Sequence, residues 1–162
     1  MINFCFPENR SVFNELESLY QEKHRAYHNG VHIIDCLKKL DAYKKELPLK
    51  KEMELAFWFH DCIYNPYGKD NELKSALKAT QFLSEQQADQ EQHTQIHNLI
   101  MATLHNGIPK NETEALFIDI DLSILGASPD VYNAYAAKIR KEYKRVPRFL
   151  YRKKERKSYS FS

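Results

Sequence analysis

The chain has 162 residues, of which 43% are hydrophobic and 28% charged, and its formal net charge is only +2. This length and composition are typical of one soluble globular domain with a hydrophobic core. The small net charge argues against a nucleic-acid polymer or a membrane surface as partner. The three cysteines form no CxxC pair and predict no disulfide framework. Because neither a signal peptide nor a membrane-spanning run is recognisable, we expect a protein of the reducing cytoplasm.

Apolar residues recur at intervals of three or four along the chain, which predicts an all-α fold. Ser11 is the expected cap of a first helix, and Asn29-Gly30 marks a turn at which a second helix begins. Pro48 precedes a third helix, which is expected to run from about Lys50 to Tyr64. The segment Asn65-Pro66-Tyr67-Gly68 is expected to end it.

The second half of the chain continues this helical pattern. Asp70 or Asn71 is expected to cap a fourth helix, and the polar stretch Ser84–Gln95 is interpreted as a helix end and a solvated connection. Further apolar helical segments are predicted at Ile96–Leu104 and at Ala115–Leu125, which carries Asp119 and Asp121. The sequence therefore predicts a bundle of helices with no strand.

A seventh helix is expected after Ser128-Pro129, because serine is a common cap and proline is favoured at the first helical position. We expect this helix to bury Val131, Tyr135 and Ile139. Beyond Pro147 the sequence becomes basic without a clean period. We therefore predict a single domain over residues 1–147 and a loosely ordered basic tail over residues 148–162.

One ionisable pair interrupts the most apolar part of the chain. His60 and Asp61 follow directly after Leu55–Phe59, which we expect to be buried. A buried ionisable pair costs several kcal/mol unless it is paired or coordinates a metal. A core histidine with an aspartate partner and a metal site are both consistent with the dipeptide alone.

Other polar residues in apolar helical stretches extend this pair to a possible ligand set. His32, His60, Asp61 and one later aspartate, either Asp119 or Asp121, would supply two imidazoles and two carboxylates from three segments. Such a set suits divalent ions, with Mn, Mg, Fe, Co, Ni and Zn all open. A bound ion lowers the pKa of its water from 15.7 toward about 7.

These residues carry a resemblance. His32, His60-Asp61 and Asp121 resemble the H…HD…D signature of the HD-domain phosphohydrolase superfamily, and Tyr27–His32 is similar to the YHNxxH segment of its cyclic nucleotide phosphodiesterases. With WFHDCIYNP, KDNELKSA and FIDIDLSILGA, the chain resembles a bacterial family of small predicted metal-dependent HD phosphohydrolases. The resemblance implies an HD-type helical bundle.

The resemblance also assigns roles. Asp121-Leu122-Ser123 is similar to the metal-binding ADLS segment of the phosphodiesterases, which favours Asp121 over Asp119 as the last ligand. His28 matches their general acid, although a helix-start histidine bonded to backbone remains the alternative. Asp61 is also expected to orient the attacking water. The additional histidines of two-metal HD enzymes are missing after the HD pair, which favours one ion and disfavours an oxygenase with two irons.

Four further residues are possible contacts to substrate. His105 resembles a histidine that contacts phosphate, but an exposed histidine at a helix end is an equally good interpretation. Lys69, Asn71 and Glu72 follow the HD pair closely enough to rim a pocket, although capping and solvation explain them as well.

The function expected from the sequence is hydrolysis of a small phosphomonoester or phosphodiester, such as a nucleotide, by a metal-activated water. The alternative is a metal- or nucleotide-binding HD module without turnover that acts as a sensor or binds a partner. The sequence leaves both the substrate and the metal open.

Overall fold

The computed structural model describes residues 10–43, 47–105 and 108–146, and within these ranges every regular element is a helix. In chain order the elements are α1 (Arg10–Tyr20), α2 (Gly30–Ala42), α3 (Lys50–Phe59), α4 (Asn71–Glu85), α5 (Gln90–Ala102), α6 (Glu112–Asp121), the 3-10 helix η1 (Leu122–Gly126) and α7 (Pro129–Glu142). The predicted all-α fold is confirmed. The tail predicted for residues 148–162 lies outside the described ranges.

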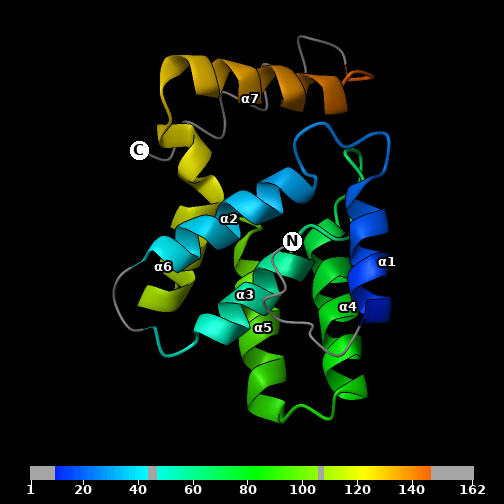
Figure 1. Cartoon of the computed structure of the whole chain (residues 1–162), viewed down its shortest axis with the longest axis vertical. Helices are drawn as coiled ribbons and strands as arrows, with labels where there is room; N and C mark the ends of the chain where they lie inside the picture. Colours follow the sequence, from blue (N-terminus) through cyan, green and yellow to red (C-terminus); the bar gives the residue numbers. More distant parts are fainter. Residues whose placement is uncertain (1–9, 44–46, 106–107, 147–162) are drawn as a thin grey trace.

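The helices surround a central α3 (Figure 1). Helix α3 packs on α2, α4 and α5, while α4 and α5 form an adjacent pair joined by a short connection. Helix α2 also contacts α6, and α7 lies across one end of the molecule, where it contacts η1. None of the described helices is long and apolar enough to cross a membrane.

Aromatic residues of α3 and α6 form the middle of the hydrophobic core. The rings of Phe57 and Phe117 stack with their centroids 4.0 Å apart, and both side chains are fully buried, as is Phe59. Each such side chain stabilises the fold by roughly 1.5–3 kcal/mol relative to its exposed state. Because Phe57 and Phe59 immediately precede His60, the core fixes the backbone from which the HD pair projects.

Side-chain caps set the starts of three helices. Asn29 accepts a hydrogen bond from the amide of Val31 at the start of α2, which confirms the predicted turn. The equivalent caps are Asp89 for α5, which accepts from Gln92, and Asn111 for α6, which accepts from Glu114.

The cap at Asp89 corrects one prediction. The segment Ser84–Gln95 contains the expected helix end and connection, but the connection is shorter than predicted, because α4 ends at Glu85 and α5 starts at Gln90. Gln87 turns the chain between them with a left-handed φ of 56°. The glutamine-rich sequence on either side is compatible with helix, and the carboxylate of Asp89 satisfies the first amides of α5.

The predicted end of the third helix is wrong. Helix α3 ends at Phe59 rather than at Tyr64, and the carbonyls of Asp61 and Cys62 accept hydrogen bonds from the guanidinium of Arg25. In a continued helix the Cys62 carbonyl would need an amide hydrogen from residue 66, which is a proline and has none. The HD pair therefore lies on a short non-helical segment just after α3.

Helix α7 differs from the prediction in what it buries. Its start at Pro129 after Ser128 is as predicted, but Val131 is 49% exposed and Tyr135 and Ile139 are only partly buried. The buried residue of α7 is Glu142.

Two smaller differences concern helix ends. The sixth segment starts at Glu112, three residues earlier than predicted, because Asn111 caps it, and after Asp121 it continues as η1 to Gly126, where its end was predicted. Asp70 precedes α4, but its carboxylate pairs with Lys74 instead of capping the helix.

Candidate metal centre

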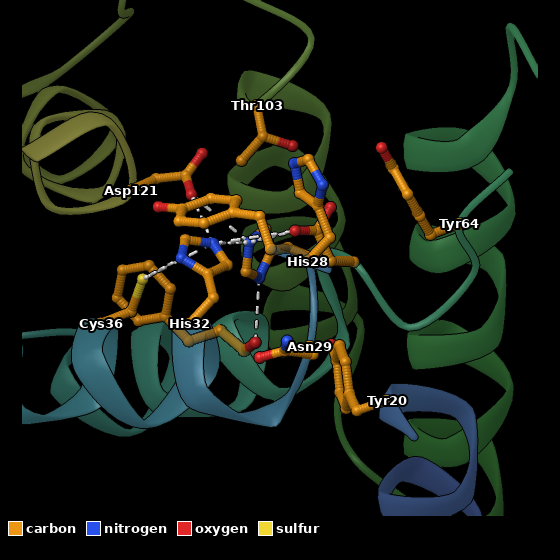
Figure 2. Close-up of polar contacts among 12 residues, drawn as sticks. Tyr20, His28, Asn29, His32, Cys36, Tyr64, Thr103 and Asp121 are labelled. Carbon is orange, nitrogen blue, oxygen red and sulfur yellow. Dashed lines mark hydrogen bonds and ion pairs between the residues drawn. The ribbon is translucent and has the colours of Figure 1, made fainter. Parts of the chain in front are cut away.

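Four polar side chains from three segments meet at the end of the core. His32 lies in the first turns of α2, His60 and Asp61 follow α3, and Asp121 is the last residue of α6. We call these residues the four-residue cluster. The imidazoles are 5% and 2% exposed, and each carboxylate side chain is less than one fifth exposed. Figure 2 shows His32 and Asp121 directed toward one another.

Each carboxylate of the cluster has one oxygen within 3.7 Å of both histidine Nε2 atoms. His32 Nε2 is 3.0 Å from Asp121 Oδ1 and 3.7 Å from Asp61 Oδ2. His60 Nε2 is 3.2 Å from the same Asp61 oxygen and 3.5 Å from the same Asp121 oxygen. The two Nε2 atoms are 3.3 Å apart. The two imidazole nitrogens are therefore adjacent, and an oxygen of each carboxylate lies beside both of them.

A backbone contact orients the His60 ring. Its Nδ1 lies 2.9 Å from the carbonyl oxygen of Phe57, so this nitrogen carries the proton and donates it. The Nε2 lone pair of the neutral ring is then directed at the cluster, which is the arrangement that metal-binding histidines usually have. Since His32 presents the same nitrogen, the two rings can share either a proton or a cation.

The charges in the cluster favour a positive occupant. Burial alone would lower the pKa of His60, but Asp61 and Asp121 raise it well above its usual value. Burial would conversely raise the pKa of both carboxyls, yet the neighbouring histidines hold both values well below the usual range. The cluster thus stabilises positive charge in its centre.

Asp119 and Asp121 occupy different environments on α6. Asp119 is exposed, whereas Asp121 faces the two imidazoles. Residues two apart on a helix point in nearly opposite directions, so only one of them can reach the cluster. The geometry favours Asp121 over Asp119, in agreement with the choice made from the sequence.

His105 contacts the second oxygen of Asp121. Its Nε2 lies 3.5 Å from Asp121 Oδ2, and 36% of the side chain is exposed. The backbone of His105 is left-handed, with φ of 50°, directly after α5. This conformation is strained for a residue other than glycine. It directs the imidazole at the carboxylate, so His105 contacts the cluster and does not only end a helix.

His28 is held by a carboxylate instead of by backbone. Its Nδ1 is 2.7 Å from Glu142 Oε2, and its ring stacks on Tyr64 with centroids 4.3 Å apart. Burial lowers the pKa of His28, but the charges of Asp61 and Glu142 outweigh it and raise the value above 6.5. An imidazole whose surroundings favour its protonated form therefore lies beside the cluster, with its ring 6.2 Å from that of His32.

Sequence analysis missed Glu142. One of its oxygens accepts hydrogen bonds from three successive amides, at 2.7 Å from Ala26, 2.7 Å from Tyr27 and 3.0 Å from His28. The other accepts from His28 and from the Tyr64 hydroxyl at 2.8 Å. In the sequence, Glu142 is surrounded by basic residues, a pattern that is typical of a solvated helix face. The signal that could have identified it is its spacing of three and seven residues from Ile139 and Tyr135, which places it on their face.

Arg25 was missed as well. Its buried guanidinium donates to the carbonyls of His28 at 3.0 Å, Asp61 at 2.7 Å and Cys62 at 2.9 Å. Its Nε pairs with Glu22 at 2.9 Å. Arg25 therefore joins the segment before α2 to the segment after α3, and so sets the positions of His28 and Asp61 relative to one another.

The three predicted rim residues are not brought to the cluster. Within the described ranges, Lys69, Asn71 and Glu72 make no hydrogen bond or ion pair with it. Lys69 is exposed, and the Asn71 side chain binds both the amide and the carbonyl of Asn65. Asn71 thus closes the turn after the HD pair.

Comparison with known proteins identifies no relative. No family model matches the sequence, and neither a curated protein nor a solved structure matches the chain.

Proposed function

We propose that this protein is a metal-dependent phosphohydrolase of the HD type that hydrolyses a small phosphomonoester or phosphodiester, such as a nucleotide. The observation that carries the proposal is the convergence of the four-residue cluster, with its carboxylate oxygens 3.0–3.7 Å from the histidine nitrogens. The order of these residues along the chain and the all-helical fold support it.

The donor set fits one divalent ion. Two neutral imidazoles and two carboxylates balance a charge of +2, and mixed nitrogen and oxygen ligands suit Mn, Mg, Fe, Co, Ni and Zn to different degrees. When bound, such an ion would lower the pKa of a water toward about 7 and neutralise charge on a phosphoryl oxygen. The partial exposure of Asp61 and Asp121 leaves the cluster accessible from solvent.

His28 is the proposed general acid. Nδ1 donates to Glu142, so the proton that the cationic ring would transfer to the leaving oxygen is the one on Nε2. The charges of Asp61 and Glu142 outweigh burial and raise the pKa of His28, which favours this protonated form. Asp61 is proposed to orient the attacking water, and His105 to hold Asp121 and to contact substrate phosphate with its exposed side.

The buried thiols suit the proposed location in the cytoplasm. Cys36 and Cys62 are free and buried, as expected for a protein kept in a reducing compartment.

The proposal is tested with the metal-stripped protein and two substrates, p-nitrophenyl phosphate and bis-p-nitrophenyl phosphate, each with every divalent ion named above. Wild type is compared with Asp61→Ala and Asp121→Asn, and the matched control is Asp119→Asn on the exposed side of the same helix. We expect turnover in wild type and the control with at least one of these ions, and none above background in the two cluster variants.

A second comparison isolates the general acid. His28→Gln should lower kcat by about 10²–10⁴-fold and leave the Mn²⁺ affinity within about twofold, since His28 is not a ligand. Stoichiometric metal binding without turnover on a broad panel of phosphate esters would refute the enzyme and support the binding module. Absence of metal binding would refute both the enzyme and the metal-binding module.

A further inference from the structure

A cysteine lies against the candidate metal centre. Cys36 follows His32 by one turn of α2 and is 1% exposed. Its Sγ is 3.8 Å from Nδ1 and 3.9 Å from Nε2 of His32. Figure 2 shows the sulfur directed at the His32 ring. A third type of ligand atom is therefore present beside the imidazoles and carboxylates.

Two overlapping groups of side chains could each surround one ion. The first is His32, His60 and Asp61, and the second is His32, Cys36 and Asp121. In each group the ligand atoms lie within 4.8 Å of one another. Because His32 belongs to both, one ion that engages His32 can use either group.

We infer that the ligand set depends on the ion: a thiophilic ion such as Zn²⁺ or Cd²⁺ binds through His32, Cys36 and Asp121, whereas Mn²⁺ or Mg²⁺ binds on the side of His60 and Asp61. The inference rests on the metal centre of the proposed function. It goes beyond that function by assigning Cys36 as a ligand and by making soft ions competitors of the ion that supports turnover.

The chemistry of the two groups supports this division. Each group contains His32 and one carboxylate, so the groups differ in having the Cys36 thiolate or the His60 imidazole. Thiolate selects soft ions, whereas Mg²⁺ and Mn²⁺ prefer oxygen ligands and are not held by sulfur. When the soft ion binds, the Cys36 S–H proton passes to solvent and a sulfur–metal bond forms. The Cys36 thiolate and the Asp121 carboxylate then balance the charge of +2, with His32 neutral. An ion held there no longer needs Asp61, the residue proposed to orient the water, so Zn²⁺ or Cd²⁺ should suppress turnover.

Cys62 provides the matched control. It is fully buried and follows Asp61 directly, yet it belongs to neither ligand group. Cys5 is retained in every variant, so its contribution to any signal stays constant. The variants are Cys36→Ser and Cys62→Ser, and circular dichroism verifies that both fold.

The first measurement is ultraviolet absorption during titration of the metal-stripped protein with Cd²⁺ and with Co²⁺. Wild type and Cys62→Ser should show a sulfur-to-metal charge-transfer band at one equivalent that is stronger than any band of Cys36→Ser. Metal binding without this band in wild type, or a band of equal intensity in Cys36→Ser, overturns the inference while the proposed function stands. Failure of any ion to bind overturns both.

The second measurement compares affinities. Cys36→Ser should weaken Cd²⁺ binding by at least about 10–100-fold, the loss that even outer contacts of metal sites cause, and leave Mn²⁺ affinity within about twofold. Asp61→Asn should weaken Mn²⁺ binding more than Cd²⁺ binding. If each variant lost the same affinity for Cd²⁺ as for Mn²⁺, both ions would use a single ligand set, and the inference would be overturned.

The third measurement needs no variant and so does not depend on folding of a mutant. X-ray absorption of the zinc-loaded wild type should require one sulfur neighbour at about 2.3 Å. A zinc shell of nitrogen and oxygen alone overturns the inference.

Discussion

Replacing Glu142 by glutamine should destabilise the protein in a pH-dependent way. Glu142 is buried and accepts four hydrogen bonds from residues 26–28, including that of the His28 ring, and a fifth from Tyr64. Burial alone would raise the pKa of this carboxyl, but the His28 contact and the other hydrogen bonds outweigh burial and lower it from 4.5 to about 2. The ionised form is therefore the one that the folded protein stabilises.

The sign and size of the effect follow from this difference. A carboxyl whose pKa is lowered on folding contributes stability that is present above its unfolded value of 4.5 and is lost as the pH falls through about 2. The change from 4.5 to about 2 corresponds to about 3 kcal/mol of unfolding free energy at neutral pH. The raised pKa of His28 comes from Asp61 and from this same Glu142 contact, so the contact is not counted a second time.

The assay is urea denaturation followed by far-ultraviolet circular dichroism between pH 2 and pH 7. Glu142→Gln should lose about 3 kcal/mol at pH 7 relative to wild type, and the difference should shrink as the pH approaches 2. Glu17→Gln, an exposed glutamate of α1, is the control and should stay within about 0.5 kcal/mol of wild type. Equal midpoints and slopes for Glu142→Gln and wild type at pH 7 would refute the reasoning.

Three further predictions concern the elements around the cluster. Arg25→Met leaves three carbonyls without their donor and should lower the free energy of unfolding by about 3 kcal/mol, measured by urea denaturation. An unchanged midpoint would show that these three hydrogen bonds do not stabilise the fold. Asn111→Ala removes the cap of α6 and should cost about 1 kcal/mol, and a change below about 0.3 kcal/mol would show that the cap is dispensable. Mn²⁺ at 100 times its dissociation constant should stabilise wild type by about 2.7 kcal/mol, measured as a rise in melting temperature that EDTA reverses. Asp61→Ala should show no rise, and an equal rise in this variant would place the ion elsewhere.

The helices were predictable because their signals are local. Asn29 both ends a turn and caps α2, and the apolar spacing of three and four residues identifies the buried stripes of most helices. The end of α3 was only partly predictable in this way. Pro66 is a local signal against a longer helix, but the donor that satisfies the free carbonyls is Arg25, which lies 36 and 37 positions away from them.

The residues of the candidate site also differ in whether a local sequence signal identifies them. His60 and Asp61 stand out because they interrupt an apolar run, and Asp121 was preferred from a resemblance in its local sequence. Glu142 carries no such mark, since an acidic residue near the basic end of a helix is usually solvated. Its partners lie 78 and 114–116 positions away, and a single sequence contains no record of that pairing.

Two buried ions of opposite sign, Arg25 and Glu142, hold the segment that carries His28. Arg25 binds its carbonyl side and Glu142 its amide side, so each charge is satisfied mainly by backbone and neither needs the other. This arrangement makes α7 a polar attachment, because its buried residue is Glu142 and not an apolar side chain. Loss of the charge on that carboxylate should therefore weaken the contacts that α7 makes with residues 26–28, including the His28 ring. The aromatic core around Phe57 positions the cluster, whereas this polar attachment positions the proposed acid.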